Sequence, residues 1–284
     1  MLLDNTLIKA ALLGAAFLLS VSGCTTVDPS GNPAHIIAWA AKQDFWVSNI
    51  RAGTFRLASF SRGAMVTGDT MVVYIEGDGA PWVTPYHPPR DPTPQKPVSL
   101  TLAAVDPAQK VVYLGRPCQY LDAEALRNCD SAYWIERRFA PEVIAAYDDA
   151  LTQLKASLGV RQIRLVGFSG GGVIAVLVAA RRNDVESLIT VAAPLAVSEW
   201  VVWHNASPLI GSLDPAELGE NVHLPPSVHF VGNRDKIVPV SVVEKFTRRK
   251  GGHMETILDF DHDCCWSRDW AKLLGRVLTR EVAK

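Results

Sequence analysis

The chain has 284 residues, a formal net charge of −1 and 48% hydrophobic residues, proportions that exclude a disordered protein. Lys and Arg occur only in short, scattered runs such as Arg137-Arg138, which we interpret as solvated surface. Nucleic-acid binding is therefore not expected, because phosphate recognition needs clustered cations. The length allows one large domain, or two small ones, with a sizeable core and no structural metal.

The first segment, residues 1–23, predicts an export signal. Its apolar run at 10–21 is too short for a membrane-spanning helix, which needs roughly 20 residues. The run leads into Val21-Ser22-Gly23-Cys24, which resembles a bacterial lipobox, a signal in which the cysteine is lipidated and becomes the new N-terminus. The resemblance implies a lipid anchor at Cys24 and a place in the bacterial cell envelope. An ordinary signal peptide is the alternative.

Residues 24–50 are predicted to be a polar tether and N-terminal segment. Beyond it lie four cysteines, and an even number in an exported chain predicts disulfides, with three possible pairings. We favour Cys118–Cys129, because a bond between the adjacent Cys264 and Cys265 would be strained. A zinc site is disfavoured, since no C-x-x-C pair is present, and no cofactor is predicted.

The rest of the chain alternates between strand and helix patterns. Apolar, β-branched runs predict strands at 54–60, 71–76, 110–115, 162–168, 187–192, 227–231 and 254–260. Several are continuous apolar runs, which are typical of parallel strands covered on both faces. Helices are predicted at 141–158, 170–181, 240–249 and 266–278. This alternation predicts an α/β fold over residues 51–284, with a doubly wound, mostly parallel sheet that binds ligands at the carboxyl ends of its strands.

The strongest chemical signal is Gly167-Phe168-Ser169-Gly170-Gly171, which lies directly between a predicted strand and a predicted helix. A nucleophile elbow requires this strand–turn–helix order and small residues around a strained serine. Ser169 is therefore the candidate nucleophile. The alternative is a glycine-rich tight turn that only packs the helix against the sheet.

A serine hydroxyl becomes a good nucleophile only when a base takes its proton and an acid orients that base. His262 follows the last predicted strand, and Asp235 lies in the turn after the strand before it. The alternatives are a surface-loop histidine and a turn or N-cap aspartate. Asp261 and Asp263 compete for the role of the acid, but side chains adjacent to His262 rarely reach its far ring nitrogen.

The chain order Ser169, Asp235, His262, with the elbow around the serine, resembles the α/β-hydrolase superfamily. The resemblance covers about residues 51–284 and implies a serine hydrolase that forms an acyl-enzyme. Three further segments resemble those of an exported bacterial α/β-hydrolase group whose substrate is not settled: 113–120, 133–142 and 207–215.

In that superfamily two backbone N–H groups form the oxyanion hole. Carried over to this chain, they are the N–H of Gly170, after the nucleophile, and the N–H of Asp78, in the sequence Glu76-Gly77-Asp78-Gly79. The family often has histidine where this chain has Glu76. The carboxylate of Asp78 would oppose an oxyanion unless it points away.

Residues 194–226 lie between two predicted strands where hydrolases carry their caps. We predict a short lid over an apolar acyl pocket, with Trp203 and His204 as substrate contacts, and a surface loop as the alternative. Trp82, after the predicted oxyanion loop, is a third candidate contact. The proline-rich segment 85–97 is predicted to form a stiff rim.

Taken together, these signals predict an envelope-anchored serine hydrolase that cleaves carboxylic esters or thioesters of a small or lipid-like molecule. One alternative is a peptidase or amidase with the same three side chains. The other is a non-catalytic envelope lipoprotein that uses the fold for binding. The oligomeric state leaves no signal in the sequence.

Overall fold

The computed structural model describes residues 32–63, 68–80, 87–127 and 129–282. Its eight-stranded sheet has the order β1-β2-β4-β3-β5-β6-β7-β8. Strands β1 and β2 pair antiparallel, β2 pairs antiparallel with β4, and the remaining neighbours are parallel. The strands are β1 Trp46–Ala52, β2 Phe55–Arg62, β3 Thr70–Ile75, β4 Val111–Leu114, β5 Gln162–Phe168, β6 Val185–Val191, β7 Ser227–Gly232 and β8 His253–Ile257.

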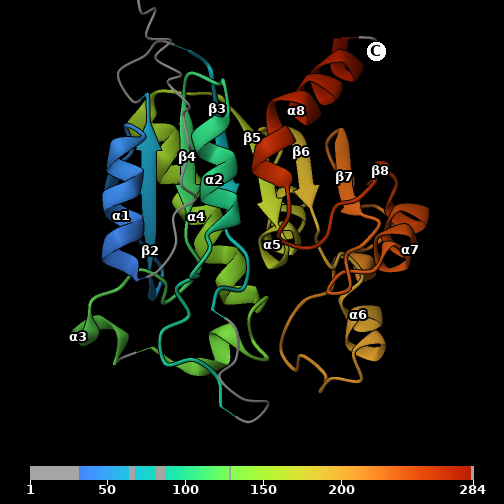
Figure 1. The fold of residues 1–284 in the computed structure, drawn as a ribbon, viewed down its shortest axis with the longest axis horizontal. Coiled ribbons are helices and arrows are strands. Elements are labelled where there is room, and N and C mark those ends of the chain that lie inside the picture. Colours follow the sequence, from blue (N-terminus) through green and yellow to red (C-terminus); the bar gives the residue numbers. More distant parts are fainter. Residues whose placement is uncertain (1–31, 64–67, 81–86, 128, 283–284) are drawn as a thin grey trace, which may run out of the picture.

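Helices cover both faces of this sheet (Figure 1). On one face lie α4 (Pro141–Leu158), α5 (Gly170–Ala179) and α7 (Val240–Lys250), whose apolar side chains share one core cluster. On the other lie α1 (Pro33–Lys42), α2 (Val98–Val105) and α8 (Trp266–Val282), which share a second cluster. The predicted fold class, a doubly wound and mostly parallel α/β sheet, is confirmed.

Strand β5 shows why the continuous apolar runs indicate central strands. Its Leu165 belongs to the core cluster on one face, and Val166 and Phe168 belong to the cluster on the other. A strand needs apolar residues at every position when both its faces are covered. This burial holds β5 rigidly between β3 and β6, and the strand ends at the residue before Ser169.

Helix α4 begins and ends where the sequence predicts. Pro141 occupies its first turn, where its missing N–H leaves no hydrogen bond unmade, and Gly159 ends it with a positive φ of 62°. The buried side of the helix includes Val143, Tyr147 and Leu154. The Tyr147 hydroxyl donates to the Gly115 carbonyl at 2.7 Å, which ties α4 to the end of β4.

The segment predicted as a tether contains regular structure. Asn32 caps α1 by accepting the N–H of His35 at 3.0 Å, and β1 follows as an edge strand whose side chains are mostly exposed. An edge strand exposed on both faces has no apolar run for the sequence to show. Helix α2 was also not predicted, because its sequence, in which Ser99 and Thr101 alternate with apolar residues, lacks helical periodicity.

The predicted cap, residues 194–226, contains α6 (Val197–Trp203) and the short 3-10 helix η2 (Pro215–Glu217). The chain between β4 and α4 adds α3 (Ala123–Leu126) and the 3-10 helix η1 (Ser131–Trp134). Within the described residues, no helix combines the length and the apolar character that a membrane span requires.

Candidate active site

Ser169 lies at the sharp turn between β5 and α5, where its backbone adopts φ 49° and ψ −125°. A positive φ is uncommon for a residue with a side chain. With this conformation Ser169 continues neither the strand before it nor the helix after it. Ser169 is held there because its N–H donates to the Val191 carbonyl at 2.8 Å and its carbonyl accepts the N–H of Gly172 at 2.9 Å. The turn therefore has the geometry of the predicted nucleophile elbow.

The three predicted side chains meet at the carboxyl end of the sheet. His262 Nε2 lies 3.1 Å from the Ser169 hydroxyl, and its Nδ1 lies 2.9 Å from Asp235 Oδ2. An ionised carboxylate only accepts hydrogen bonds, so it holds the imidazole proton on Nδ1 and leaves Nε2 free to accept from Ser169. His262 is 93 positions from Ser169 and 27 positions from Asp235 in the sequence, yet the three side chains form one hydrogen-bonded chain.

Asp235 is oriented by its own turn. Its side chain is 0% exposed, and its Oδ1 accepts the N–H groups of Ile237 at 2.8 Å and Val238 at 2.7 Å. These donors occupy one carboxylate oxygen and point the other at His262. The two hydrogen bonds therefore fix the direction of the Asp235 side chain.

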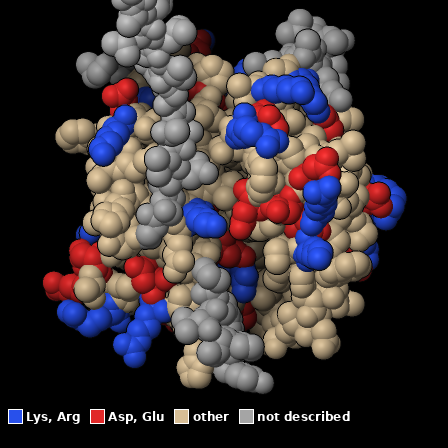
Figure 2. Space-filling model, in the orientation of Figure 1, with Lys and Arg blue, Asp and Glu red and all other residues tan. Residues whose placement is uncertain are grey.

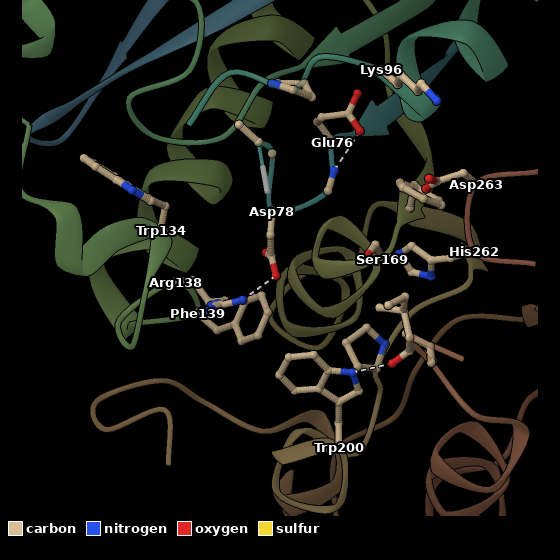
Figure 3. A pocket seen from close by; sticks show the side chains of 18 of the residues that line it. Glu76, Asp78, Lys96, Trp134, Arg138, Phe139, Ser169, Trp200, His262 and Asp263 are labelled. Carbon is tan, nitrogen blue, oxygen red and sulfur yellow. Dashed lines mark hydrogen bonds and ion pairs between the residues drawn. The ribbon is translucent and has the colours of Figure 1, made fainter. Parts of the chain in front are cut away.

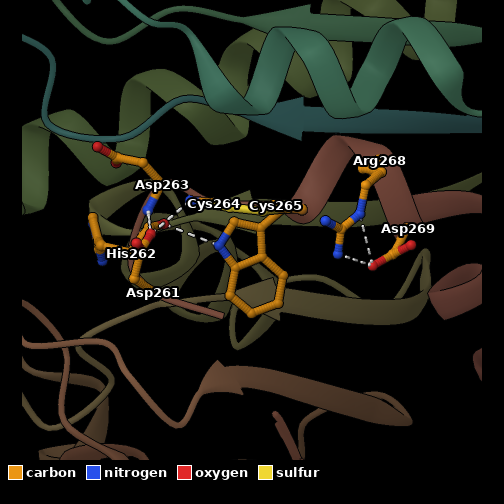
Figure 4. The surroundings of a disulfide bond; sticks show 8 residues. Asp261, His262, Asp263, Cys264, Cys265, Arg268 and Asp269 are labelled. Atoms are coloured by element: carbon orange, nitrogen blue, oxygen red, sulfur yellow. Dashed lines mark hydrogen bonds and ion pairs between the residues drawn. A yellow bond between two sulfur atoms is a disulfide. The ribbon is translucent and has the colours of Figure 1, made fainter. Parts of the chain in front are cut away.

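The loop that carries His262 is held from two sides (Figure 4). The carbonyl of His262 accepts the indole N–H of Trp266 at 2.9 Å, which ties the loop to α8. Asp261 Oδ1 accepts the N–H groups of Asp263 at 3.0 Å and Cys264 at 2.7 Å. Neither Asp261 nor Asp263 replaces Asp235, because Asp261 is committed to its own loop and Asp235 holds the imidazole.

The loop after β3 brings Asp78 beside Gly170. A Cβ atom built on Gly170 would lie 2.0 Å from Asp78 Oδ1, so a larger residue would displace the Asp78 carboxylate. Neither the N–H of Gly170 nor that of Asp78 has a hydrogen-bond partner among the described residues. An oxyanion hole requires two N–H donors near the nucleophile that are available to an incoming oxygen.

The Asp78 carboxylate is neutralised by two arginines. Arg116 donates to its Oδ1 at 2.8 Å and Arg138 to its Oδ2 at 2.7 Å, while their side chains are 3% and 12% exposed. Burial by itself would raise the pKa of Asp78, but the charges of Arg138 and Arg116 hold it below its ordinary value. Arg138 is therefore part of the site, and its interpretation as solvated surface is wrong.

A pocket of about 510 Å³ opens in front of Ser169 (Figure 3). Much of its wall is apolar, formed by Trp134, Phe139, Pro194, Val197, Trp200, Ile237 and Val238. Polar side chains gather on the side of the oxyanion loop, among them Glu76, Asp78 and Arg138. Figure 2 shows the hollow in the molecular surface, with acidic and basic side chains interspersed around it.

The predicted substrate contacts need correction. Trp203 is 61% exposed and is not part of the pocket wall, and His204 Nε2 lies 2.8 Å from the Ile237 carbonyl, where it stabilises the cap. The tryptophan that lines the pocket is Trp200, whose indole N–H donates to the same carbonyl at 2.7 Å. Trp200 and Trp203 are three residues apart, which is almost one helical turn, so they lie on nearly the same side of the helix. Sequence alone therefore does not show which of the two faces the pocket.

Two predicted residues, Trp82 and Cys24, lie outside the described residues. The structure joins Cys118 to Cys129, the favoured pairing, and also joins Cys264 to Cys265. The Cys118–Cys129 disulfide stays a prediction. In the described part of the chain, no three His, Cys, Asp or Glu side chains gather in a way that would hold a metal ion.

His229 is a core residue. It is buried in β7, and its Nδ1 lies 2.9 Å from the Thr190 hydroxyl. Burial lowers the pKa of His229 to about 3, so the ring is neutral at physiological pH.

Comparison with solved structures agrees with this geometry. An esterase from Pyrococcus furiosus superposes with a TM-score of 0.60 at 12% identity, covering 84% of this chain and 93% of that one. The chain has the α/β-hydrolase fold. A bacterial membrane phospholipase A matches with a TM-score of 0.55 at 16% identity over 86% and 92% of the two chains. A lidless α/β serine hydrolase from Xanthomonas campestris matches with a TM-score of 0.51 at 13% identity over 82% and 92%.

Comparison by sequence, by contrast, finds no match. No family model matches this chain, and no curated protein matches it significantly. At 12–16% identity the structural neighbours share its fold, and the activity has to be argued from the site.

Proposed function

We propose that the protein is a serine hydrolase that cleaves carboxylic esters or thioesters. The observation that carries the proposal is the hydrogen-bonded chain from Ser169 through His262 to Asp235, beside the N–H groups of Gly170 and Asp78, which have no partner among the described residues. Nucleophile, base, orienting acid and oxyanion donors all lie within one pocket, which is the set of groups that acyl transfer requires.

Ser169 Oγ attacks the carbonyl carbon of the substrate as His262 Nε2 takes the hydroxyl proton. The negative charge that forms on the carbonyl oxygen is stabilised by the N–H groups of Gly170 and Asp78. The tetrahedral intermediate collapses, His262 returns the proton to the leaving alcohol or thiol, and an acyl-serine remains. Water then attacks this ester with His262 again as base, which releases the acid and restores Ser169.

The chemistry of the pocket favours an apolar acyl group. Trp134, Phe139 and Trp200 offer aromatic surface, while Val197 and Ile237 add aliphatic surface. Burial of an acyl chain against such a wall contributes about 0.8 kcal/mol for each CH₂ group. Solved structures with the same fold include an esterase and a phospholipase A, which is consistent with an ester substrate, and also a puromycin hydrolase.

The proposal is tested with a series of p-nitrophenyl esters from acetyl to dodecanoyl. We expect turnover of the esters, with kcat/KM rising by up to about threefold to fourfold per CH₂ until the pocket is filled. A fluorophosphonate probe should label the folded protein at Ser169. Peptide-anilide turnover without ester turnover would support an amidase instead, and failure of both turnover and labelling would favour a non-catalytic binding lipoprotein.

We also propose that the protein is lipid-anchored in the bacterial cell envelope through Cys24. The support lies in the sequence Val21-Ser22-Gly23-Cys24 and the apolar run before it. An anchored enzyme would meet lipid-like esters at the membrane surface, which is consistent with an apolar pocket.

The Cys24→Ser variant tests the anchor. In bacteria fed a radiolabelled fatty acid, the wild-type protein should carry the label and sediment with membranes, whereas the variant should lose both properties. Ester hydrolysis by the variant should be unchanged, because Cys24 lies outside the hydrolase domain. Label that persists in the variant would exclude Cys24 as the site of attachment.

A further inference from the structure

Glu76 is the first residue after β3 and begins the loop that carries Asp78. It lines the pocket of Ser169, yet the whole residue is only 1% exposed. A carboxyl group at such a depth needs partners or must give up its charge. The superfamily often places histidine at this position, so the resemblance assigns no role to a glutamate here.

One oxygen of Glu76 organises the oxyanion loop (Figure 3). Its Oε1 accepts the N–H of Gly77 at 2.8 Å and the N–H of Ser99 at 3.4 Å. The Ser99 hydroxyl in turn donates to the carbonyl of Ile75 at 3.0 Å. The carboxyl thereby joins the end of β3, the oxyanion loop and the start of α2.

The loop fixed in this way lies directly against the nucleophile. A Cβ atom built on Gly77 would lie 3.4 Å from Ser169 Cβ. Because Glu76 occupies the N–H of Gly77, the next N–H along the loop, that of Asp78, remains for an oxyanion. A shift of the Glu76 carboxyl would move both residues.

The second oxygen of Glu76 is less well supported. Its Oε2 is buried and lacks a hydrogen-bond partner of normal geometry among the described residues. The Tyr113 hydroxyl faces the same carboxyl group and lies 3.0 Å from the Tyr120 hydroxyl. The buried Arg116 is committed to Asp78 and to the Arg138 carbonyl. A carboxylate charge at Glu76 would therefore be poorly compensated, and the neutral acid is favoured.

We propose that Glu76 is a positioning residue that acts as a neutral carboxylic acid. It holds the backbone of Gly77 and Asp78 in place for the oxyanion, and its ionisation opposes the negative charge that develops there. This inference rests on the proposed hydrolase function and adds a residue to its machinery.

The proposal has a consequence for pH. Burial raises the pKa of Glu76 to about 7. The hydrogen bonds from the backbone N–H groups and the Tyr113 hydroxyl lower the pKa, but their effect is smaller than that of burial. The group is neutral below that pH and ionised above it, so kcat/KM should fall as the pH rises through about 7. The other groups that face Glu76 are Tyr113 on β4, Tyr120 after it, Tyr147 on α4, and the pair Asp78–Arg116.

The same ionisation acts on stability. The pKa of Glu76 in the folded protein is raised above the ordinary value of 4.5. Its contribution to the free energy of unfolding is therefore fully present below pH 4.5 and is lost as the pH rises to about 7. A glutamine at this position cannot ionise and should not show the loss. Stability therefore gives a readout of Glu76 that does not depend on catalysis.

The test compares Glu76→Gln and Glu76→Ala with wild type and with Glu244→Gln, which removes a charge from the surface of α7. Turnover of p-nitrophenyl butyrate and thermal unfolding are measured from pH 5 to 9. We expect Glu76→Gln to keep kcat/KM within about threefold of wild type at pH 6 and to lack the fall above pH 7. Glu76→Ala should lose about tenfold to a hundredfold in kcat at every pH, because the loop loses its anchor.

The Tm values should also distinguish Glu76→Gln from wild type as the pH rises. The Tm of Glu76→Gln should exceed that of wild type by several degrees above pH 7, with a difference that grows between about pH 4.5 and 7. Superimposable pH profiles of activity and of Tm for wild type and Glu76→Gln would overturn the inference. If wild type neither turns over esters nor reacts with a fluorophosphonate, the proposed function itself fails, and the Tm profile still reports on the charge state of Glu76.

Discussion

Replacing Ser169 with alanine is expected to abolish ester hydrolysis and leave the fold intact. The substitution removes the attacking oxygen, whose hydroxyl lies 3.1 Å from His262 Nε2. Without a nucleophile the remaining groups only bind and polarise the substrate, and kcat should fall by about 10⁵-fold to 10⁶-fold. This is the largest effect that the structure predicts.

The fold should persist because alanine meets the same backbone constraint as serine. The positive φ of 49° is set by the bonds from Ser169 N–H to Val191 and from Gly172 to the Ser169 carbonyl, and both involve the main chain. Far-ultraviolet circular dichroism and thermal unfolding should therefore match wild type.

Turnover of p-nitrophenyl acetate measures the effect, with Ser157→Ala as the matched control. Ser157 is exposed on α4, and its hydroxyl bonds only to the Leu154 carbonyl. The control should hydrolyse the ester like wild type. Wild-type rates in Ser169→Ala would remove this serine from the mechanism.

The second-largest effect is expected for Asp235→Asn. In the wild-type protein Asp235 Oδ1 accepts two N–H groups, from Ile237 and Val238, and Oδ2 faces His262 Nδ1. Asparagine has one oxygen, which the two N–H donors should retain, so its NH₂ group should turn to His262. An NH₂ group can only donate, which leaves Nδ1 as an acceptor and places the ring proton on Nε2.

A proton on Nε2 prevents His262 from accepting the proton of Ser169. The expected result is a loss of about 10⁴-fold in kcat with little change in KM, because the pocket wall is untouched. Steady-state kinetics with p-nitrophenyl butyrate measures both parameters, and Asp149→Asn on the exposed side of α4 serves as the control. A loss of less than tenfold would show that Asp235 is not the group that sets the tautomer.

The nucleophile could be predicted from sequence because its signal is local. The strand, the glycine-rich turn and the helix around Ser169 occupy one continuous segment, and each part has its own pattern. His262 and Asp235 could be predicted because parallel strands end at one edge of a sheet, so a residue that follows a strand reaches the same crevice. The structure places both within hydrogen-bonding distance of their partners.

The residues that sequence reasoning missed act through long-range contacts. Arg138 pairs with Asp78 across 60 positions of chain, and Glu76 contacts Ser99 across 23. An arginine in a charged run and a glutamate at a strand end have the same local patterns whether they are solvated or buried. Trp200 could not be separated from Trp203 because both lie on α6, and only the packing of that helix decides which one faces the pocket.

The sequence alone determined strands β2 to β8, helices α4, α5, α7 and α8, the α/β class and the three candidate catalytic side chains, because hydrophobic periodicity and turn chemistry act over a few neighbouring residues. The antiparallel edge formed by β1, the charge balance around Asp78 and the wall of the pocket were decided by tertiary structure. Burial changes the free energy of a polar group only after distant segments have packed around it, and no local pattern records that event.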